Sequence, residues 1–185
     1  MPHVLRNSFL LIVIFLSACS DGSDKKVAEK KTTETETGNA NSKFGYFKPD
    51  GDSLIVPAFE IEVHLSQKAE AKLSKENETI IVSASFIGIP KDTTSTAFLE
   101  SGETGIAGKD IEIRNGSIAK FENIKFSKSL YDSLSDKDIQ LLINVFSGRH
   151  SSTDNLLDCG IIEDKLSKVR GKKFKIDCKL IYGED

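Results

Sequence analysis

The chain has 185 residues, of which 25 are Lys or Arg and 28 are Asp or Glu, so its formal net charge is −3. So small a charge excludes the strongly basic proteins that attract nucleic acid over long distances. The length is typical of a single domain that buries a hydrophobic core of its own. We therefore expect one domain and no nucleic-acid partner.

The first 19 residues combine Arg6, an apolar run over residues 9–16, and the sequence Leu16-Ser17-Ala18-Cys19. A run of this length is too short to cross ~30 Å of hydrocarbon at ~1.5 Å per residue, which favours a signal segment. The four residues resemble the lipobox of bacterial lipoprotein signal peptides. The resemblance implies that residues 1–18 are removed and that Cys19 carries lipid. An ordinary secretory signal with a coincidental cysteine is the alternative.

The resemblance also implies a location. Acyl chains such as palmitate on Cys19 would anchor the protein permanently, because each buried CH₂ contributes ~0.8 kcal/mol. Ser20 follows the cysteine where an Asp would favour the inner membrane. By resemblance to the sorting rule of enteric bacteria, this implies the outer membrane of the bacterial cell envelope, with the domain in the periplasm.

Residues 20–42 are nearly all polar or charged and cannot bury a core. We therefore expect residues 19–42 to comprise the lipidated cysteine and a flexible tether, and residues 43–185 to form the folded domain. A tether of this length would let the domain reach both the membrane surface and nearby cell-wall polymers.

Strand patterns dominate the domain. They cover seven segments: residues 58–65, 79–89, 110–114, 117–121, 139–146, 155–162 and 172–182. The second segment is apolar on both faces, which predicts a central strand. Between the third and fourth, Asn115-Gly116 predicts the type I′ turn of a β-hairpin. Short helices are predicted over 66–73, which Ser66 can cap, and over 164–169.

About seven strands with turns at short intervals predict a mainly β fold. We expect a single antiparallel β-sandwich of the immunoglobulin or transthyretin-like kind, with one or two short helices. An up-and-down barrel is the alternative.

The three cysteines separate into one lipid acceptor, Cys19, and one remaining pair, Cys159 and Cys178. In an oxidising envelope compartment this pair is expected to form a disulfide. Alternation in the last strand turns Cys178 toward the core. The alternative is a metal site made by the two cysteines with His64 or His150, but no short ligand spacing supports it.

A polar loop at 147–155 contains the candidate partner-binding residues Arg149, His150 and Ser152. His, Ser and Asp occur together there, but neighbouring loop residues rarely provide the geometry of a catalytic triad. The chain also has no Gly-x-Ser-x-Gly nucleophile elbow. We therefore predict a recognition loop or a simple turn, and no catalytic residue.

A basic stretch near the C-terminus places Lys173, Lys175 and Lys179 on one face of the last strand. They are candidate contacts for an anionic polymer or an acidic protein surface. The alternative is a solvated face, or an edge strand that lysines protect against pairing with other chains.

These observations favour a non-catalytic envelope lipoprotein whose β domain binds a protein or polymer partner as an accessory or assembly factor, without metal or cofactor. The alternatives are an enzyme that acts on an envelope substrate through a site assembled from separate loops, and a lipoprotein that binds a small ligand.

Overall fold

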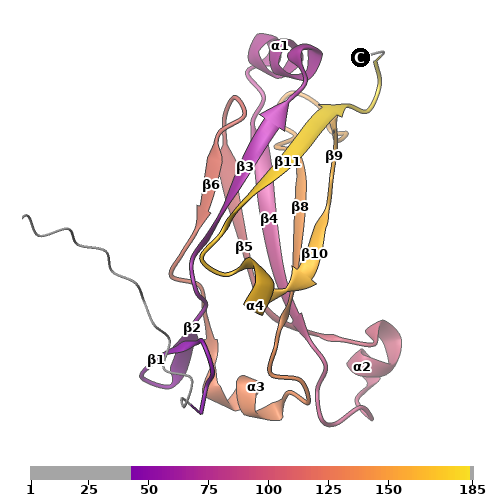
Figure 1. Cartoon of the computed structure of the whole chain (residues 1–185). Helices are drawn as coiled ribbons and strands as arrows, with labels where there is room; N and C mark the ends of the chain where they lie inside the picture. The colour runs from indigo at the N-terminus through magenta and orange to yellow at the C-terminus, as the bar shows by residue number, and fades with distance from the viewer. Residues whose placement is uncertain (1–42, 184–185) are drawn as a thin grey trace, which may run out of the picture. The chain divides into compact units, whose positions relative to one another are not determined.

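The computed structural model describes residues 43–183, which form eleven strands and four short helices (Figure 1). The strands are β1 (Lys48–Asp50), β2 (Ser53–Ile55), β3 (Phe59–Leu65), β4 (Ile80–Gly88), β5 (Thr104–Ile113), β6 (Ile118–Phe121), β7 (Lys125–Ser127), β8 (Gln140–Ser147), β9 (Leu157–Cys159), β10 (Ile162–Lys165) and β11 (Lys173–Leu180). The helices are α1 (Gln67–Glu76), α2 (Thr96–Ser101), α3 (Lys128–Ser133) and α4 (Leu166–Val169). None of these helices is long and apolar enough to span a membrane. The signal segment at 1–18 and the lipidated cysteine and tether at 19–42 lie outside the described residues.

Two four-stranded sheets provide most of the domain, with orders β10-β8-β4-β5 and β6-β3-β11-β9, and β1-β2-β7 form a smaller third sheet. Figure 1 shows the two larger sheets one in front of the other. Buried and partly exposed residues alternate along β3, β4 and β8, so each of these strands turns one face toward the shared core. The fold is therefore mainly β and sandwich-like, as predicted.

The expectation of a purely antiparallel sandwich of about seven strands is wrong in two respects. First, β11 pairs with β3 in parallel, from Lys173 beside Glu60 to Cys178 beside Leu65. Second, the third sheet consists of three-residue strands that no predicted segment covers. Alternation of polar and apolar residues shows which side chains face the core, but it does not show the direction of a strand or its partner. A strand of three residues is too short for the alternation to be recognised.

The Asn115-Gly116 turn has the predicted backbone, with φ of 51° and 48°, but it does not join two paired strands. On one side of the turn β5 pairs with β4, and on the other side β6 pairs with β3 in the opposite sheet. A Cβ on Gly116 would lie 3.1 Å from the carbonyl oxygen of Val63. The hairpin prediction is therefore wrong, because the turn is an arch that carries the chain from one sheet to the other.

The core is aromatic around β3 and is closed at one end by α1. Phe59 stacks on Phe121 with ring centroids 4.9 Å apart and meets Phe86 edge-on at 6.3 Å. The predicted first helix is confirmed: Ser66 caps α1 by accepting a hydrogen bond from the backbone of Ala69, which is buried.

The opposite end of the domain is where the described chain begins. Phe47 is buried and packs edge-on against Phe126 at 5.2 Å and Tyr131 at 5.5 Å. Tyr46 donates a hydrogen bond to Asp138 at 2.8 Å. Figure 1 shows this end, with β1, β2 and α3, farthest from α1. The chain therefore enters the domain at the end away from α1.

Candidate functional site

The predicted recognition loop connects β8 to β9, and a buried carboxylate holds it in place. Glu78 lies in the two-residue connection between the cap of α1 and β4, and it is only 2% exposed. Its carboxylate accepts hydrogen bonds from the backbone N–H and the hydroxyl of Ser151, both at 2.6 Å. It also accepts from the backbone N–H groups of His150 at 3.1 Å and Thr79 at 2.9 Å. One side chain thus satisfies four donors, three of which belong to the loop.

These hydrogen bonds decide the charge of Glu78. Burial by itself would raise the pKa of Glu78, but the hydrogen bonds from Ser151 and from two further backbone N–H groups outweigh it and lower the pKa to about 2. The carboxylate is therefore ionised at neutral pH. An ionised acceptor makes stronger hydrogen bonds than a neutral one, so the loop is firmly held.

The loop leaves β8 through Gly148, where there is no space for a side chain. The backbone N–H of Gly148 donates to the carbonyl of Thr79 at 2.8 Å. A Cβ at this position would lie 2.0 Å from the Thr79 hydroxyl oxygen and 3.2 Å from a carboxylate oxygen of Glu78. The backbone can approach β4 and Glu78 this closely only because residue 148 is glycine.

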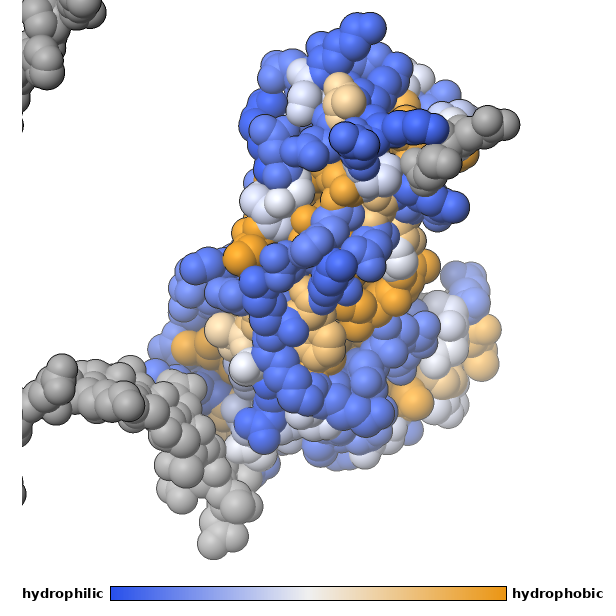
Figure 2. Space-filling view, turned by 45° about the horizontal axis from the view of Figure 1, so that its top comes forward, coloured by the Kyte–Doolittle hydropathy of each residue, from blue (hydrophilic) through white to orange (hydrophobic). Residues whose placement is uncertain are grey.

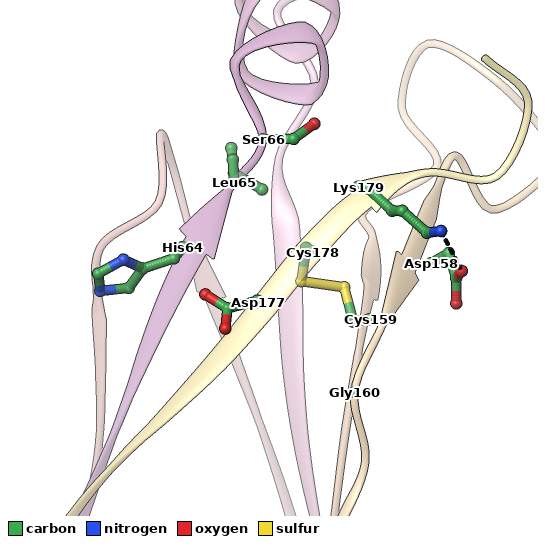
Figure 3. A pocket seen from close by; sticks show the side chains of 9 residues that line it. All are labelled: His64, Leu65, Ser66, Asp158, Cys159, Gly160, Asp177, Cys178 and Lys179. Carbon is green, nitrogen blue, oxygen red and sulfur yellow. Dashed lines mark ion pairs between the residues drawn. A yellow bond between two sulfur atoms is a disulfide. The ribbon is translucent and has the colours of Figure 1, made fainter. Parts of the chain in front are cut away.

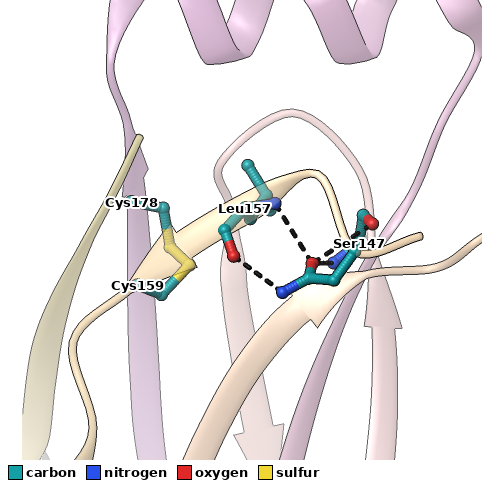
Figure 4. Close-up of a disulfide and its surroundings, with 5 residues drawn as sticks. Ser147, Leu157, Cys159 and Cys178 are labelled. Carbon is teal, nitrogen blue, oxygen red and sulfur yellow. Dashed lines mark hydrogen bonds between the residues drawn. A yellow bond between two sulfur atoms is a disulfide. The ribbon is translucent and has the colours of Figure 1, made fainter. Parts of the chain in front are cut away.

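The other end of the loop is fixed by Asn155, four residues before Cys159. Figure 4 shows Ser147 and Leu157 near the Cys159–Cys178 disulfide. The side-chain oxygen of Asn155 accepts from the backbone N–H groups of Ser147 at 2.9 Å and Leu157 at 3.1 Å, and its amide donates to the Leu157 carbonyl at 2.8 Å. Cys159, two residues after Leu157, forms a disulfide with Cys178, its direct neighbour across the β9–β11 pair. The predicted disulfide is confirmed, and Cys178 faces the core at 3% exposure.

Between these fixed ends the loop exposes Arg149 and His150, while Ser152 is half-buried. Arg149 has a φ of 62°, in the left-handed region, and its guanidinium lies 5.8 Å from the centre of the Phe146 ring. His150 contacts Glu112 of β5 at 2.9 Å. The Ser151 hydroxyl donates to Glu78 and not to His150. Ser151 and His150 are therefore not arranged as a nucleophile and its base.

The three candidate lysines lie on the outer face of the β6-β3-β11-β9 sheet, and each faces a carboxylate. Lys173 pairs with Glu62 at 2.7 Å, Lys175 with Asp177 at 2.9 Å, and Lys179 with Asp158 at 3.9 Å. All three side chains are about half exposed. Figure 2 shows a largely hydrophilic surface with hydrophobic residues exposed between the hydrophilic ones. Exposed pairs of this kind contribute little stability, but they balance the charge of the face.

An open hollow of about 560 Å³ surrounds the disulfide on this sheet (Figure 3). Its lining includes His64 and Asp177, which are direct neighbours on β3 and β11, together with the Lys179–Asp158 pair. Because both cysteines are in the disulfide, they cannot ligate a metal ion with His64 or His150. Residues 43–183 contain no group of three or more His, Cys, Asp or Glu side chains placed to hold one.

The partner-binding residues predicted from the sequence lie in two parts of the domain, and only one of the two sets is brought together. Arg149, His150 and Ser152 belong to one fixed loop, whereas the lysines are spread along β11, with Lys173 about 20 Å from Lys179 at ~3.3 Å per residue. The residues that fix the loop, Glu78 and Asn155, were missed. Glu78 stands in an unremarkable helix-to-strand connection, and no sequence pattern links it to a loop more than seventy residues later.

Comparison of the chain with protein-family models, with curated proteins and with solved structures finds no match. The argument for a binding role therefore depends on the loop and on the outer face of the β6-β3-β11-β9 sheet.

Proposed function

We propose that the protein is a non-catalytic lipoprotein of the bacterial cell envelope, anchored through Cys19 in the outer membrane with its domain in the periplasm. Its β domain binds a partner through the loop at 148–155, and it acts as an accessory or assembly factor. The anchor rests on the lipobox-like sequence that ends at Cys19, and the binding role rests on the loop.

The observation that carries the binding role is the fixation of the loop by Glu78. An exposed loop ordered in advance loses little conformational entropy when a partner binds, so more of the contact energy appears as affinity. The buried carboxylate and the close approach at Gly148 provide this order. Arg149 is held at positive φ, which costs on the order of 1 kcal/mol and is typical of functional positions.

The position of the loop supports the same proposal. The loop follows β8 and is held by Glu78 at the α1 end of the domain, whereas the chain enters at the opposite end. Because the expected tether joins the domain at that opposite end and is flexible, the loop stays free of the attachment point. Arg149 and His150 would then be accessible to a partner in the periplasm.

A protein partner is favoured over an anionic polymer. Binding a polyanion requires cations without nearby carboxylates, but each of the three candidate lysines faces an acidic side chain within 4 Å. Arg149, in contrast, offers a planar group with several donors, which suits recognition of carboxylates and backbone carbonyls on a protein.

Crosslinking in living cells tests this proposal. A photoreactive residue is placed at Arg149, at Ser152 or at Lys175, and at Lys48 of β1 as a matched exposed control at the opposite end of the domain. We expect the same protein to be captured at Arg149 and Ser152 but not at Lys48. The Glu78→Gln substitution should reduce the capture by loosening the loop. Equal capture at all positions, or none at the loop, would contradict the proposal.

A further inference from the structure

The outer face of the β10-β8-β4-β5 sheet carries large apolar side chains that the core does not bury. Along β4 and β8, buried residues alternate with partly exposed ones, and the partly exposed side chains point to the outside of the sheet. Those that are large and apolar are Ile81, Ile87, Leu142 and Phe146. They form a strip over two neighbouring strands, and an apolar strip on a surface is a candidate for contact with another molecule.

The strand register places bulky side chains on one margin of this face and very small ones on the other. Ser85 of β4 lies between Leu142 of β8 and Gly108 of β5. Further along, Ile87 also has a glycine beside it on β5, Gly105. A Cβ on Gly105 would meet no atom within 4 Å, and a Cβ on Gly108 would meet only a backbone oxygen at 3.7 Å. The β8 margin is therefore raised, and the β5 margin is recessed.

The two margins also carry unpaired charges of opposite sign. On the β8 side, the guanidinium of Arg149 lies over the Phe146 ring and has no carboxylate partner among residues 43–183. On the β5 side, Asp110 lies beside Ser83, and its carboxylate has no hydrogen-bond or ion-pair partner within the same range. Unlike the lysines of the opposite sheet, these two charged groups are free to pair with groups outside the chain.

The differences between the two margins complement each other about a twofold axis that runs along β4. Rotation about this axis turns a second face toward the first, keeps each residue at its level along the strands and exchanges the two margins. The raised β8 margin of each copy then lies over the recessed β5 margin of the other. Leu142 of one copy faces Gly108 of the other, and Arg149 approaches Asp110. Most oligomers of two identical chains use the same patch on both copies in this way.

The place where the chain enters the domain agrees with this axis. Because the axis is parallel to the strands, both copies keep the end with β1, β2 and α3 on the same side (Figure 1). Two chains anchored in one membrane can therefore pair through this face. A twofold axis across the strands would place the two entry ends on opposite sides of the pair.

We propose that the outer face of the β10-β8-β4-β5 sheet pairs with the same face of a second copy of this chain, about a twofold axis along β4. Four strands ~4.8 Å apart, with about eight residues at ~3.3 Å each, give roughly 500 Å² per copy. The total of roughly 1,000 Å² is the lower limit for a specific interface, so the pair is weak and benefits from anchoring in one membrane. This inference rests on the proposed function, because it names a second copy as one partner of Arg149.

Crosslinking between two copies tests the position of the axis. Ser83 lies on β4 in the middle of the face, so the new thiols of two Ser83→Cys chains would lie opposite each other. The full chain in membranes is treated with a short bifunctional maleimide, and electrophoresis under reducing conditions measures the fraction of crosslinked pairs. The control is Glu60→Cys, at a partly exposed position of β3 in the opposite sheet. We expect crosslinked pairs from Ser83→Cys and few from Glu60→Cys.

Further substitutions in the Ser83→Cys chain test the shape and the charges of the interface. Gly108→Leu fills the recess on β5 and should lower the crosslinked fraction about tenfold. Gly160→Leu, at another glycine with space for a Cβ, is the matched control and should not lower it. Arg149→Asp should also lower the fraction, because it faces Asp110 with a like charge, and adding Asp110→Arg should restore the pairs.

The absence of crosslinked pairs from Ser83→Cys would overturn the proposal. Crosslinking that Gly108→Leu and Arg149→Asp both leave unchanged would also overturn it, because the two copies would then meet through a different surface. A product that contains another protein in place of the second copy would show that this other protein covers the face. If pairing fails but photocrosslinking at Ser152 still captures another protein, the proposed function stands without this inference.

Discussion

The Glu78→Gln substitution tests most directly whether a buried carboxylate fixes the loop at 148–155. Glutamine keeps the size of the side chain but replaces one acceptor oxygen with an NH₂ group. If that group takes the place of the oxygen that faces Ser151, it meets two donors, the backbone N–H and the hydroxyl. Both hydrogen bonds are lost, and the Ser151 donors are left facing another donor.

The magnitude follows from the pKa of Glu78. Folding lowers this pKa from its ordinary value of 4.5 to about 2, and each unit corresponds to ~1.4 kcal/mol, so the ionised form contributes at most about 3 kcal/mol to stability. We expect Glu78→Gln to lower the free energy of unfolding by about this amount and Tm by roughly 10 °C. Urea unfolding at pH 7 measures the change, with the exposed Glu122→Gln as the control. A loss below about 1 kcal/mol would refute the reasoning.

The lowered pKa of Glu78 also predicts how the stability of the domain depends on pH. The pKa of Glu78 is lower in the folded than in the unfolded protein. Ionised Glu78 therefore contributes its full share to the free energy of unfolding at pH values above the ordinary pKa of 4.5, and this share is lost as the pH falls toward about 2. The stability difference between wild type and Glu78→Gln should therefore shrink across this window. A difference that stays constant from pH 6 to pH 2 would mean that folding does not shift the pKa of Glu78.

Three further substitutions or treatments test the other parts of the structure. Gly148→Ala should destabilise the domain by about 2 kcal/mol in urea unfolding, since the new Cβ would overlap the Thr79 hydroxyl; a neutral effect would mean that the loop can shift away. Reduction of Cys159–Cys178, which closes a separation of 19 residues, should lower stability by ~3 kcal/mol and Tm by several degrees in calorimetry; an unchanged Tm would show that the bridge does not contribute. Cys19→Ala should leave an unlipidated precursor of higher mass, and lipid on that variant in mass spectrometry would exclude Cys19 as the acceptor.

Strand positions were predictable from the sequence because a sheet with one buried face enforces alternation. Segments 58–65, 79–89 and 139–146 agree with β3, β4 and β8 to within about two residues. The inward direction of Cys178 followed from the same rule. Each of these predictions depends only on which side of a strand meets the core, and that information lies within the segment itself.

Which strands pair with one another was not predictable from the sequence, because strand pairing depends on residues far apart in the chain. The turn at Asn115-Gly116 requires positive φ in a hairpin and in an arch alike, so its sequence could not show that β5 and β6 enter different sheets. Nor could alternation show that β11 runs parallel to β3.

The candidate functional site shows the same limit of prediction from sequence. Arg149 and His150 were identifiable because polar loop residues after an apolar strand are exposed wherever the strand lies. Glu78 was not identifiable, because a glutamate between a helix and a strand is ordinarily solvated, and only the approach of Gly148 to β4 buries it beneath the loop. The residue that matters most for order in the loop therefore lies outside it. A substitution at Glu78 should alter partner capture at Arg149 without touching any exposed side chain of the loop, which separates loss of order from loss of contact.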